Sequence, residues 1–191
     1  MRIIAVCGGK GHGKSTIGKH MPGFVQMGFA DSLKDVVALL YGYSREMLAG
    51  ETIESRNIRE MMDPTWSRAF GYGVTPRQTL QNVGCMFRDH IHPEFWCHTL
   101  AQRISSSGSD VVVTDMRFPN EAEFLRKWYG KQSVMVIHVV RPGLSDPPDL
   151  HISETSHNQI FADFEVINSG TEAELLAKVN RAVECYFREH E

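Results

Sequence analysis

The sequence predicts an α/β fold in which helices cover both faces of a parallel β-sheet. Strand-like apolar segments alternate with amphipathic helical segments along the chain. Residues 110–115, DVVVTD, form a β-branched run that ends in an acid, which is typical of a central parallel strand. Residues 2–21 pass from an apolar run through glycines into a helical pattern, as expected for a buried strand, a loop and a helix.

The first 74 residues contain two strand–helix pairs and then a weaker pattern. We expect the first helix to open at Lys14–Ser15 and a short second strand to end near Phe29. The next helix starts at about Ser32, is capped by Ser32 or Asp31 and ends at Gly42. Residues 43–74 are polar and turn-rich, which indicates an inserted segment with short helical pieces. The apolar stripe predicted for the second helix is Leu33, Val36, Val37 and Leu40.

The remaining chain returns to a regular alternation. Thr75 and Pro76 are a cap and a first-turn proline, so they predict a helix over 75–91 with a stripe of Leu80, Val83, Met86 and Phe87. A second proline opens another helix near residue 93. Strands are then expected at 110–115, 133–142 and 164–170, and helices at 119–130 and 171–187.

Length and composition restrict the function. The chain has 191 residues, of which 42% are hydrophobic and 23% charged, so one domain with a sizeable core is expected. A net charge of -3 argues against nucleic-acid binding through a broad basic surface. No apolar segment approaches membrane-spanning length. Four scattered cysteines favour a reducing, cytoplasmic setting without disulfides. Oligomeric state stays open between monomer and homodimer.

The stretch Gly8–Ser15, GGKGHGKS, fits the phosphate-binding pattern G-x-x-x-x-G-K-[ST]. Its glycines let backbone N–H groups converge on a phosphate, Lys14 can reach the β- and γ-phosphates, and the Ser15 hydroxyl can ligate Mg²⁺. The alternative is a glycine-rich turn without a ligand. The strand before the motif and the helical pattern after it favour nucleotide binding.

Several charged residues stand where a phosphoryl-transfer site would need them. Asp115 lies at the carboxyl end of a predicted central strand, where open α/β sheets place functional groups, and Arg117 follows two residues later. A site that holds two anionic substrates needs fixed positive charges. Arg77, Arg88 and Arg141 are further candidates. The alternative is that these are solvated strand ends and surface arginines.

A histidine- and cysteine-rich stretch offers a competing interpretation. His90, His92, Cys97 and His98 lie close together in HIHPEFWCH, which suggests a zinc site. Their spacing matches no common zinc pattern, and a proline that opens a helix interrupts them. We favour a polar helix end at His90 and His92, with Phe95 or Trp96 facing a pocket or the core.

Several motifs together resemble the phage-type deoxynucleoside monophosphate kinases of the P-loop kinase superfamily. The resemblance covers nearly the whole chain. Its motifs are GGKGHGKST, GFADSLKDVVALLYG, TPRQTLQNVG with a following FW, VVTDMRFPNEAEF, VIHVVRPG, HISE and VINSGTEAELL. It implies a P-loop kinase fold over 1–191, with 43–105 as an acceptor-binding helical segment and 142–160 as a lid. It also implies transfer of the ATP γ-phosphoryl group to the 5′-phosphate of a deoxynucleoside monophosphate, with ATP and Mg²⁺ as cofactors.

The resemblance further implies a role for individual residues. Lys14, Asp115, Arg117 and Arg141 would be catalytic, and Ser15 would hold the metal. ATP would contact Gly11, His12, Gly13, Lys14, Ser15, Thr16, Arg141 and Asn168. The acceptor would contact Lys10, Asp31, Leu33, Lys34, Arg77, Gln81, Gly84, Arg88, Trp96, Asp115, Arg117 and Glu154. Glu154 would position a substrate hydroxyl or base edge or, alternatively, pair with a lid arginine, and His151–Glu154 would lie in or beside the lid.

The sequence departs from the family pattern at two places, and other functions stay open. Cys85 stands where relatives often carry threonine, and a thiol is a weak hydrogen-bond partner, so base preference is open. The segment 43–74 matches nothing that can be carried over. A P-loop kinase of the dephospho-coenzyme A or phosphomevalonate type is one alternative. A nucleotide-binding switch or ATPase without an acceptor is the other, although it would not need the arginines of helix 75–91.

Overall fold

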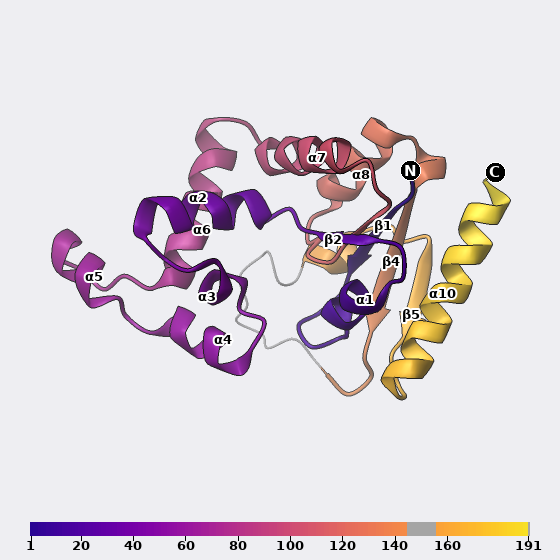
Figure 1. Cartoon of the computed structure of the whole chain (residues 1–191), viewed down its shortest axis with the longest axis horizontal. Helices are drawn as coiled ribbons and strands as arrows, with labels where there is room; N and C mark the ends of the chain where they lie inside the picture. The colour runs from indigo at the N-terminus through magenta and orange to yellow at the C-terminus, as the bar shows by residue number, and fades with distance from the viewer. Residues whose placement is uncertain (145–155, 191) are drawn as a thin grey trace. The chain divides into compact units, whose positions relative to one another are not determined.

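The computed structural model describes residues 1–144 and 156–190, which form two compact units. Met1–Phe29 and Cys97–Glu191 make up the first unit, and Ala30–Trp96 make up the second. The first unit contains the sheet, whereas the second is helical (Figure 1).

The first unit is built on a five-stranded sheet with the order β2-β3-β1-β4-β5, in which every pairing is parallel. In the central strand β1, Ile4 pairs with Val112 of β3 and Met135 of β4. The predicted parallel sheet is thus confirmed. The strands are β1 (Ile3–Cys7), β2 (Val25–Met27), β3 (Val111–Val113), β4 (Val134–Val140) and β5 (Phe164–Ile167).

Helices cover both faces of this sheet, because alternate residues of each strand point to opposite sides. Ile3 and Ala5 pack with residues of α7 and α8, whereas Ile4 and Val6 pack with residues of α1 and α10 (Figure 1). Both core clusters consist of buried, mostly aliphatic side chains. The helices are α1 (Lys14–His20), α7 (Phe95–Ser107, in this unit from Cys97 on), α8 (Pro119–Tyr129) and α10 (Glu172–Glu189), with short 3₁₀ turns η1 (Lys131–Ser133) and η2 (Ser156–Gln159).

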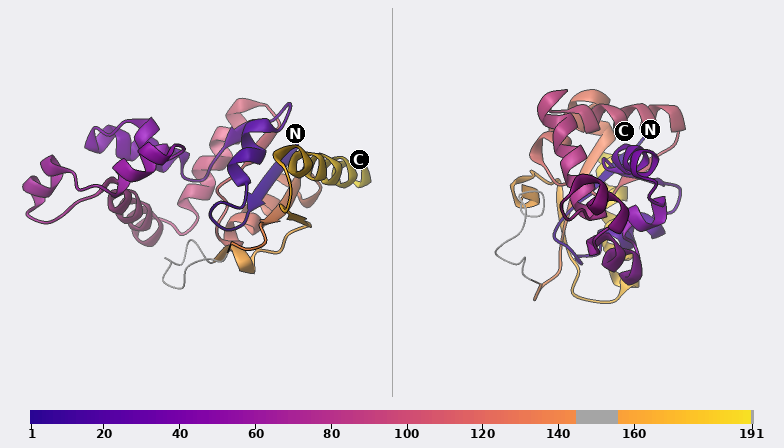
Figure 2. Two further views of the ribbon diagram at one scale, coloured as in Figure 1. Left: turned by 90° about the horizontal axis from the view of Figure 1, so that it is seen from below. Right: turned by 90° about the vertical axis from the view of Figure 1, so that its left-hand side faces the viewer.

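The second unit is a small helical body in which the predicted short helices of the inserted segment are present (Figure 2). Its core centres on Val37, Tyr43, Leu48 and Val83. The Thr75 hydroxyl accepts the Gln78 N–H at 3.2 Å, which confirms the predicted cap of α6. The helices are α2 (Asp31–Tyr41), α3 (Arg45–Ala49), α4 (Ile53–Glu60), α5 (Pro64–Phe70) and α6 (Pro76–His90).

Three local predictions for this unit are wrong. Asp31 is the first helical residue of α2, and Ala30 occupies the N-cap position without a side-chain cap. Leu40 and Met86, which were assigned to buried stripes, are 59% and 49% exposed. The helices of this unit pack around one small hydrophobic cluster. The residues at the edge of each apolar stripe therefore remain exposed to solvent.

The predictions on membrane-spanning segments and on disulfide bonds concern the helices and the four cysteines. Among the described residues, no helix combines the length and apolar character needed to cross a membrane. All four cysteines are free thiols, as expected for a chain without a disulfide framework.

Candidate functional site

The predicted phosphate-binding loop connects β1 to α1 and depends on glycine. Gly8, Gly11 and Gly13 all have positive φ, at 138°, 83° and 111°, which a residue with a side chain rarely adopts. A Cβ atom at Gly13 would lie 2.8 Å from the Asn168 side-chain nitrogen. The loop can therefore keep this shape only with glycine at these positions.

His12 and Asn168, two predicted ATP-binding residues, brace the loop against the ends of neighbouring strands. The His12 ring is buried, and its Nδ1 atom lies 3.2 Å from the Gly9 nitrogen and 3.1 Å from the Val139 carbonyl oxygen. The Asn168 amide donates to the His12 carbonyl oxygen at 2.9 Å. The Asn168 backbone N–H donates to the Val140 carbonyl oxygen at 2.8 Å. The loop is thus tied to β4 and to the residue that follows β5.

The polar side chains of the loop are suited to an anionic ligand. The Lys14 ammonium donates to the carbonyl oxygens of Gly8 and Gly9 at 2.6 and 2.7 Å, which holds the charge over the loop. No acidic residue lies in the first turn of α1. Lys10, Gly11 and Ser15 are exposed, and Thr16 is half-buried. The cradle therefore fits a nucleotide phosphate, and the Ser15 hydroxyl, a ligand type that Mg²⁺ accepts, lies exposed at the start of α1.

The segment after β3 carries two of the predicted catalytic residues. Asp115 Oδ1 accepts the Phe29 N–H at 2.8 Å, so this carboxylate fastens the end of β2 to the end of β3. Gly28 makes room for it, because a Cβ there would lie 2.6 Å from Asp115 Oδ2. Arg117 is exposed at the start of the turn into α8.

Glu121, which the sequence analysis missed, holds the backbone of the same segment. Its Oε2 atom accepts the N–H groups of Arg117 and Phe118 at 2.6 and 3.0 Å. Burial raises the pKa of this carboxyl to about 7, and the two hydrogen bonds and the Arg117 charge oppose that rise. An acid three residues after the N-cap position is a capping signal, but only the tertiary structure shows that Glu121 is buried.

The predicted lid lies mostly outside the described residues. Arg141 is exposed directly after β4, and the Leu144 N–H donates to its carbonyl oxygen at 3.3 Å. Glu154 and His151, as well as most of 142–160, fall in the part of the chain that is not described. Ser156 and His157, at the far end, are buried in η2.

In the second unit, the acceptor residues predicted on α6 share one face. Arg77, Gln81, Gly84 and Arg88 recur at steps of four, three and four residues, which places them within about 60° around the helix axis. A Cβ at Gly84 would lie 3.2 Å from Leu33 of α2. The Trp96 indole donates to the Gly84 carbonyl oxygen at 3.0 Å. Leu33, Gly84 and Trp96 are therefore brought together.

The charged acceptor candidates of this unit are engaged with their neighbours. Lys34 lies 3.6 Å from Asp31, and Arg45 contacts Asp35 at 2.6 Å and Asp31 at 3.5 Å. Arg45 was not singled out in the sequence, because its partners lie on another helix.

The two arginines of the α6 face are also held. Arg88 donates to the Cys85 sulfur at 3.2 Å, and Arg77 forms an ion pair with Glu60. The thiol that replaces the usual threonine thus contacts one of the predicted acceptor arginines.

The second unit also contains an open cavity of about 230 Å³. Gln78, Thr79 and Asn82 line it from α6, on a different face from the predicted acceptor residues. Its other walls are Tyr41, Phe70, Tyr72, Gly73 and Val74. The cavity is therefore separate from the acceptor face of that helix.

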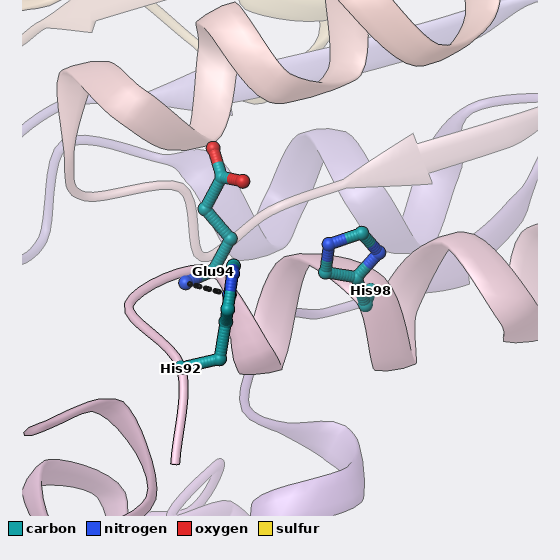
Figure 3. Close-up of side chains that lie close together, drawn as sticks. All are labelled: His92, Glu94 and His98. Atoms are coloured by element: carbon teal, nitrogen blue, oxygen red, sulfur yellow. Dashed lines mark hydrogen bonds between the residues drawn. The ribbon is translucent and has the colours of Figure 1, made fainter. Parts of the chain in front are cut away.

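The histidine-rich stretch forms a different group from the one considered in the sequence. His92, Glu94 and His98 each offer one potential ligand atom within 4.8 Å of the others (Figure 3). The His92 Nδ1 atom accepts the Glu94 N–H at 3.1 Å. Cys97 is buried in the core of the first unit. His90 ends α6, as expected.

A glycine loop that ends in Lys14–Ser15, between a strand and a helix of a parallel sheet, defines a P-loop nucleotide-binding protein. Comparison with known proteins narrows the class. A family model described as deoxynucleotide monophosphate kinase matches residues 49–179. A protein of Acanthamoeba polyphaga mimivirus named as a deoxynucleotide monophosphate kinase is 30% identical over an alignment of 203 residues, which covers 96% of this chain and 97% of the relative. This chain therefore belongs to the deoxynucleotide monophosphate kinase family and is a kinase.

Two further similarities were found. The deoxynucleoside-5′-monophosphate kinase of Escherichia phage T5 is 45% identical over an alignment of 56 residues, which covers 28% of this chain and 22% of that protein. Among solved structures, dephospho-CoA kinase from Campylobacter jejuni covers 97% of both chains with 16% identity and a TM-score of 0.47.

Proposed function

We propose that this protein transfers the γ-phosphoryl group of ATP to the 5′-phosphate of a deoxynucleoside monophosphate. The observation that carries the proposal is the braced glycine loop with Lys14 and Ser15, in a chain that belongs to the deoxynucleotide monophosphate kinase family. Products would be ADP and a deoxynucleoside diphosphate. Because the bond is remade between two phosphates, catalysis rests on positioning and charge stabilisation.

The first unit would hold ATP. Backbone N–H groups of Gly11–Thr16 would bind the phosphates, and the Lys14 ammonium would leave its loop carbonyls for the β- and γ-phosphates. Mg²⁺, held through Ser15, would supply charge neutralisation. Arg117 and Arg141 would stabilise the transferring group, and Asn168 would keep the loop in place while lying near the adenine. Asp115 would fix the segment that carries Arg117.

The second unit would hold most of the acceptor. Arg77 and Arg88 would bind its phosphate, with Gln81 on the same face of α6 and Lys10 contributed by the loop. Arg77 would leave Glu60 to bind the phosphate. Breaking this ion pair would cost little free energy, because both side chains are partly exposed to solvent. Trp96 and Leu33 would line the base pocket beside Gly84. Asp31, Lys34 and Glu154 complete the proposed set.

A coupled ADP assay with Mg-ATP tests the proposal. The purified protein is supplied in turn with each deoxynucleoside and ribonucleoside monophosphate. We expect ADP release only when a suitable deoxynucleoside monophosphate is present, and formation of its diphosphate in equal amount. ADP release without an acceptor would instead identify an ATPase. Turnover with dephospho-coenzyme A or a phosphomevalonate-like acceptor, but with no nucleotide, would also contradict the proposal.

The expected partners are small molecules alone. We place the reaction in the cytoplasm, which is the host cytoplasm for a phage-encoded enzyme, because nucleotides are abundant there and all four thiols are free. Size-exclusion chromatography with light scattering would decide between a monomer and a homodimer.

A further inference from the structure

The first unit contains a buried carboxylate that the proposed reaction does not use directly. Glu121 lies on the inner face of α8, next to Ala122 and close in sequence to the core residues Phe124 and Leu125. One of its oxygen atoms, Oε2, accepts both the Arg117 and the Phe118 N–H. The side chain therefore reaches back over the turn that connects β3 to α8.

A comparison within the same unit shows that capping alone does not require burial. Glu174 holds the same third position in α10, where it accepts the Thr171 N–H at 2.7 Å. Glu174 is exposed, and hydrogen bonds from Thr171 keep the pKa of its carboxyl below the ordinary value. Glu121 makes comparable backbone hydrogen bonds from the interior, where burial raises the pKa of the carboxyl. The buried arrangement costs stability that an exposed cap would not.

The distinguishing feature of the α8 arrangement is the residue whose backbone is held. Asp115 is fixed through its bond to Phe29, and Pro119, at the first position of α8, has a restricted φ. Glu121 fixes the two N–H groups between them. The backbone is thereby pinned on both sides of Arg117, while the Arg117 side chain stays exposed.

We propose that Glu121 is a positioning residue, which aims Arg117 at the transferring phosphoryl group by accepting the Arg117 and Phe118 N–H groups from its buried position in the first unit. This inference rests on the proposed function. Glu121 itself would not contact the substrate. A guanidinium on a fixed backbone loses less freedom when it meets the transition state, so the contribution appears in kcat rather than in substrate binding.

Four variants test this role: Glu121→Gln, Glu121→Ala, Arg117→Ala and the Glu121→Ala/Arg117→Ala double variant. The Gln amide oxygen can still accept both N–H groups, so we expect its kcat within about threefold of the unsubstituted protein. Glu121→Ala should lower kcat by about 10- to 100-fold with the KM for ATP changed less than about threefold. Glu123→Ala, an exposed position on the same helix, is the matched control and should change neither constant.

The double variant separates positioning from general damage. If Glu121 acts through Arg117, the kcat of the double variant should lie within about threefold of the kcat of Arg117→Ala. Once the Arg117 guanidinium is absent, removing Glu121 can no longer displace it. Multiplicative losses would overturn the inference. Equal activity of Glu121→Ala and the unsubstituted protein would do so as well.

A readout without turnover keeps the inference distinct from the proposed function. Hydrogen exchange of the Arg117 and Phe118 amides should accelerate at least tenfold in Glu121→Ala and stay close to the original rate in Glu121→Gln. Unchanged exchange in Glu121→Ala would overturn the inference even in an active kinase. Changed exchange in a protein that phosphorylates no nucleotide would contradict the proposed function and, with it, the catalytic purpose of Glu121.

Discussion

The two units of this kinase differ in how their cores are built. In the first unit, both faces of the sheet are covered, and two clusters enclose residues such as Ile4 and Leu100 with no exposed surface. The second unit has one small cluster around Val37 and Leu48, and large apolar side chains such as Leu39 remain exposed. The phosphate loop therefore belongs to the unit with the larger buried core, whereas the predicted acceptor residues on α6 belong to the unit with the smaller one.

The largest expected effect tests the division of labour between the units. Lys14→Ala removes the ammonium that lies over the loop carbonyls, and phosphoryl transfer should fall by about 10³-fold or more. Steady-state rates with Mg-ATP and the best acceptor measure this loss. Lys19→Ala, an exposed lysine of the same helix, is the control. An unchanged rate in Lys14→Ala would contradict the assignment of phosphoryl transfer to the phosphate loop of the first unit.

The next prediction concerns the small core of the second unit. Leu48→Ala should lower the free energy of unfolding by about 3 kcal/mol, because Leu48 is 0% exposed and its removal leaves a cavity. Leu39→Ala, at a side chain that is 84% exposed, should change it by less than about 0.5 kcal/mol. Urea denaturation measures both. Equal effects would show that the core of this unit lies elsewhere.

A third prediction compares two acids of the first unit through pH. The folded protein holds the Glu121 proton more tightly than the unfolded chain, because its pKa rises from 4.5 to about 7. The corresponding stability is present below pH 4.5 and is lost as pH rises through 7. Glu121→Gln should therefore gain stability relative to the unsubstituted protein between pH 4.5 and 8, by about 3 kcal/mol.

The matched variant Glu174→Gln should show the opposite slope. Hydrogen bonds from Thr171 lower the pKa of Glu174, so its contribution is present above the ordinary pKa and is lost as pH falls. Thermal denaturation of both variants from about pH 3 to 8 measures the two slopes, because the Glu174 contribution changes below pH 4.5 and the Glu121 contribution changes above it. Parallel slopes would contradict the assigned environments.

The smallest expected effect concerns the acceptor face of α6. Arg77→Ala should raise the KM for the acceptor by about tenfold, because the proposed phosphate contact is lost, and leave ATP affinity within about twofold, because the proposed ATP contacts lie in the first unit. Arg68→Ala, an exposed arginine of α5, is the control. An unchanged acceptor KM would mean that this face of α6 does not bind the monophosphate.

Much of the first unit follows from local sequence signals. The β-branched run before Asp115 and the glycine loop before Lys14 predicted the central strands and the phosphate-binding element, and the structure contains both. Such patterns are reliable because strand alternation and positive-φ glycines impose requirements on the residue type itself. The cap at Thr75 was predictable for the same reason, since its partner lies three residues away.

Features that depend on partners distant in sequence could not be predicted in this way. The apolar character of Leu40 and Met86 fits a buried stripe, but burial needs a neighbouring element, and none covers them within their unit. The roles of Asn168 in bracing His12 and of Cys85 in holding Arg88 depended on side-chain geometry.

The parallel α/β architecture, the phosphate loop and the family could be predicted from the sequence, because each depends on patterns of a few consecutive residues. Only the tertiary structure decided that Glu121 is buried beneath the Arg117 turn and that Asp115 fastens two strands. The residue type alone does not show whether a glutamate or aspartate side chain is solvated or buried. Its pKa and its role are set by the groups that folding brings around it.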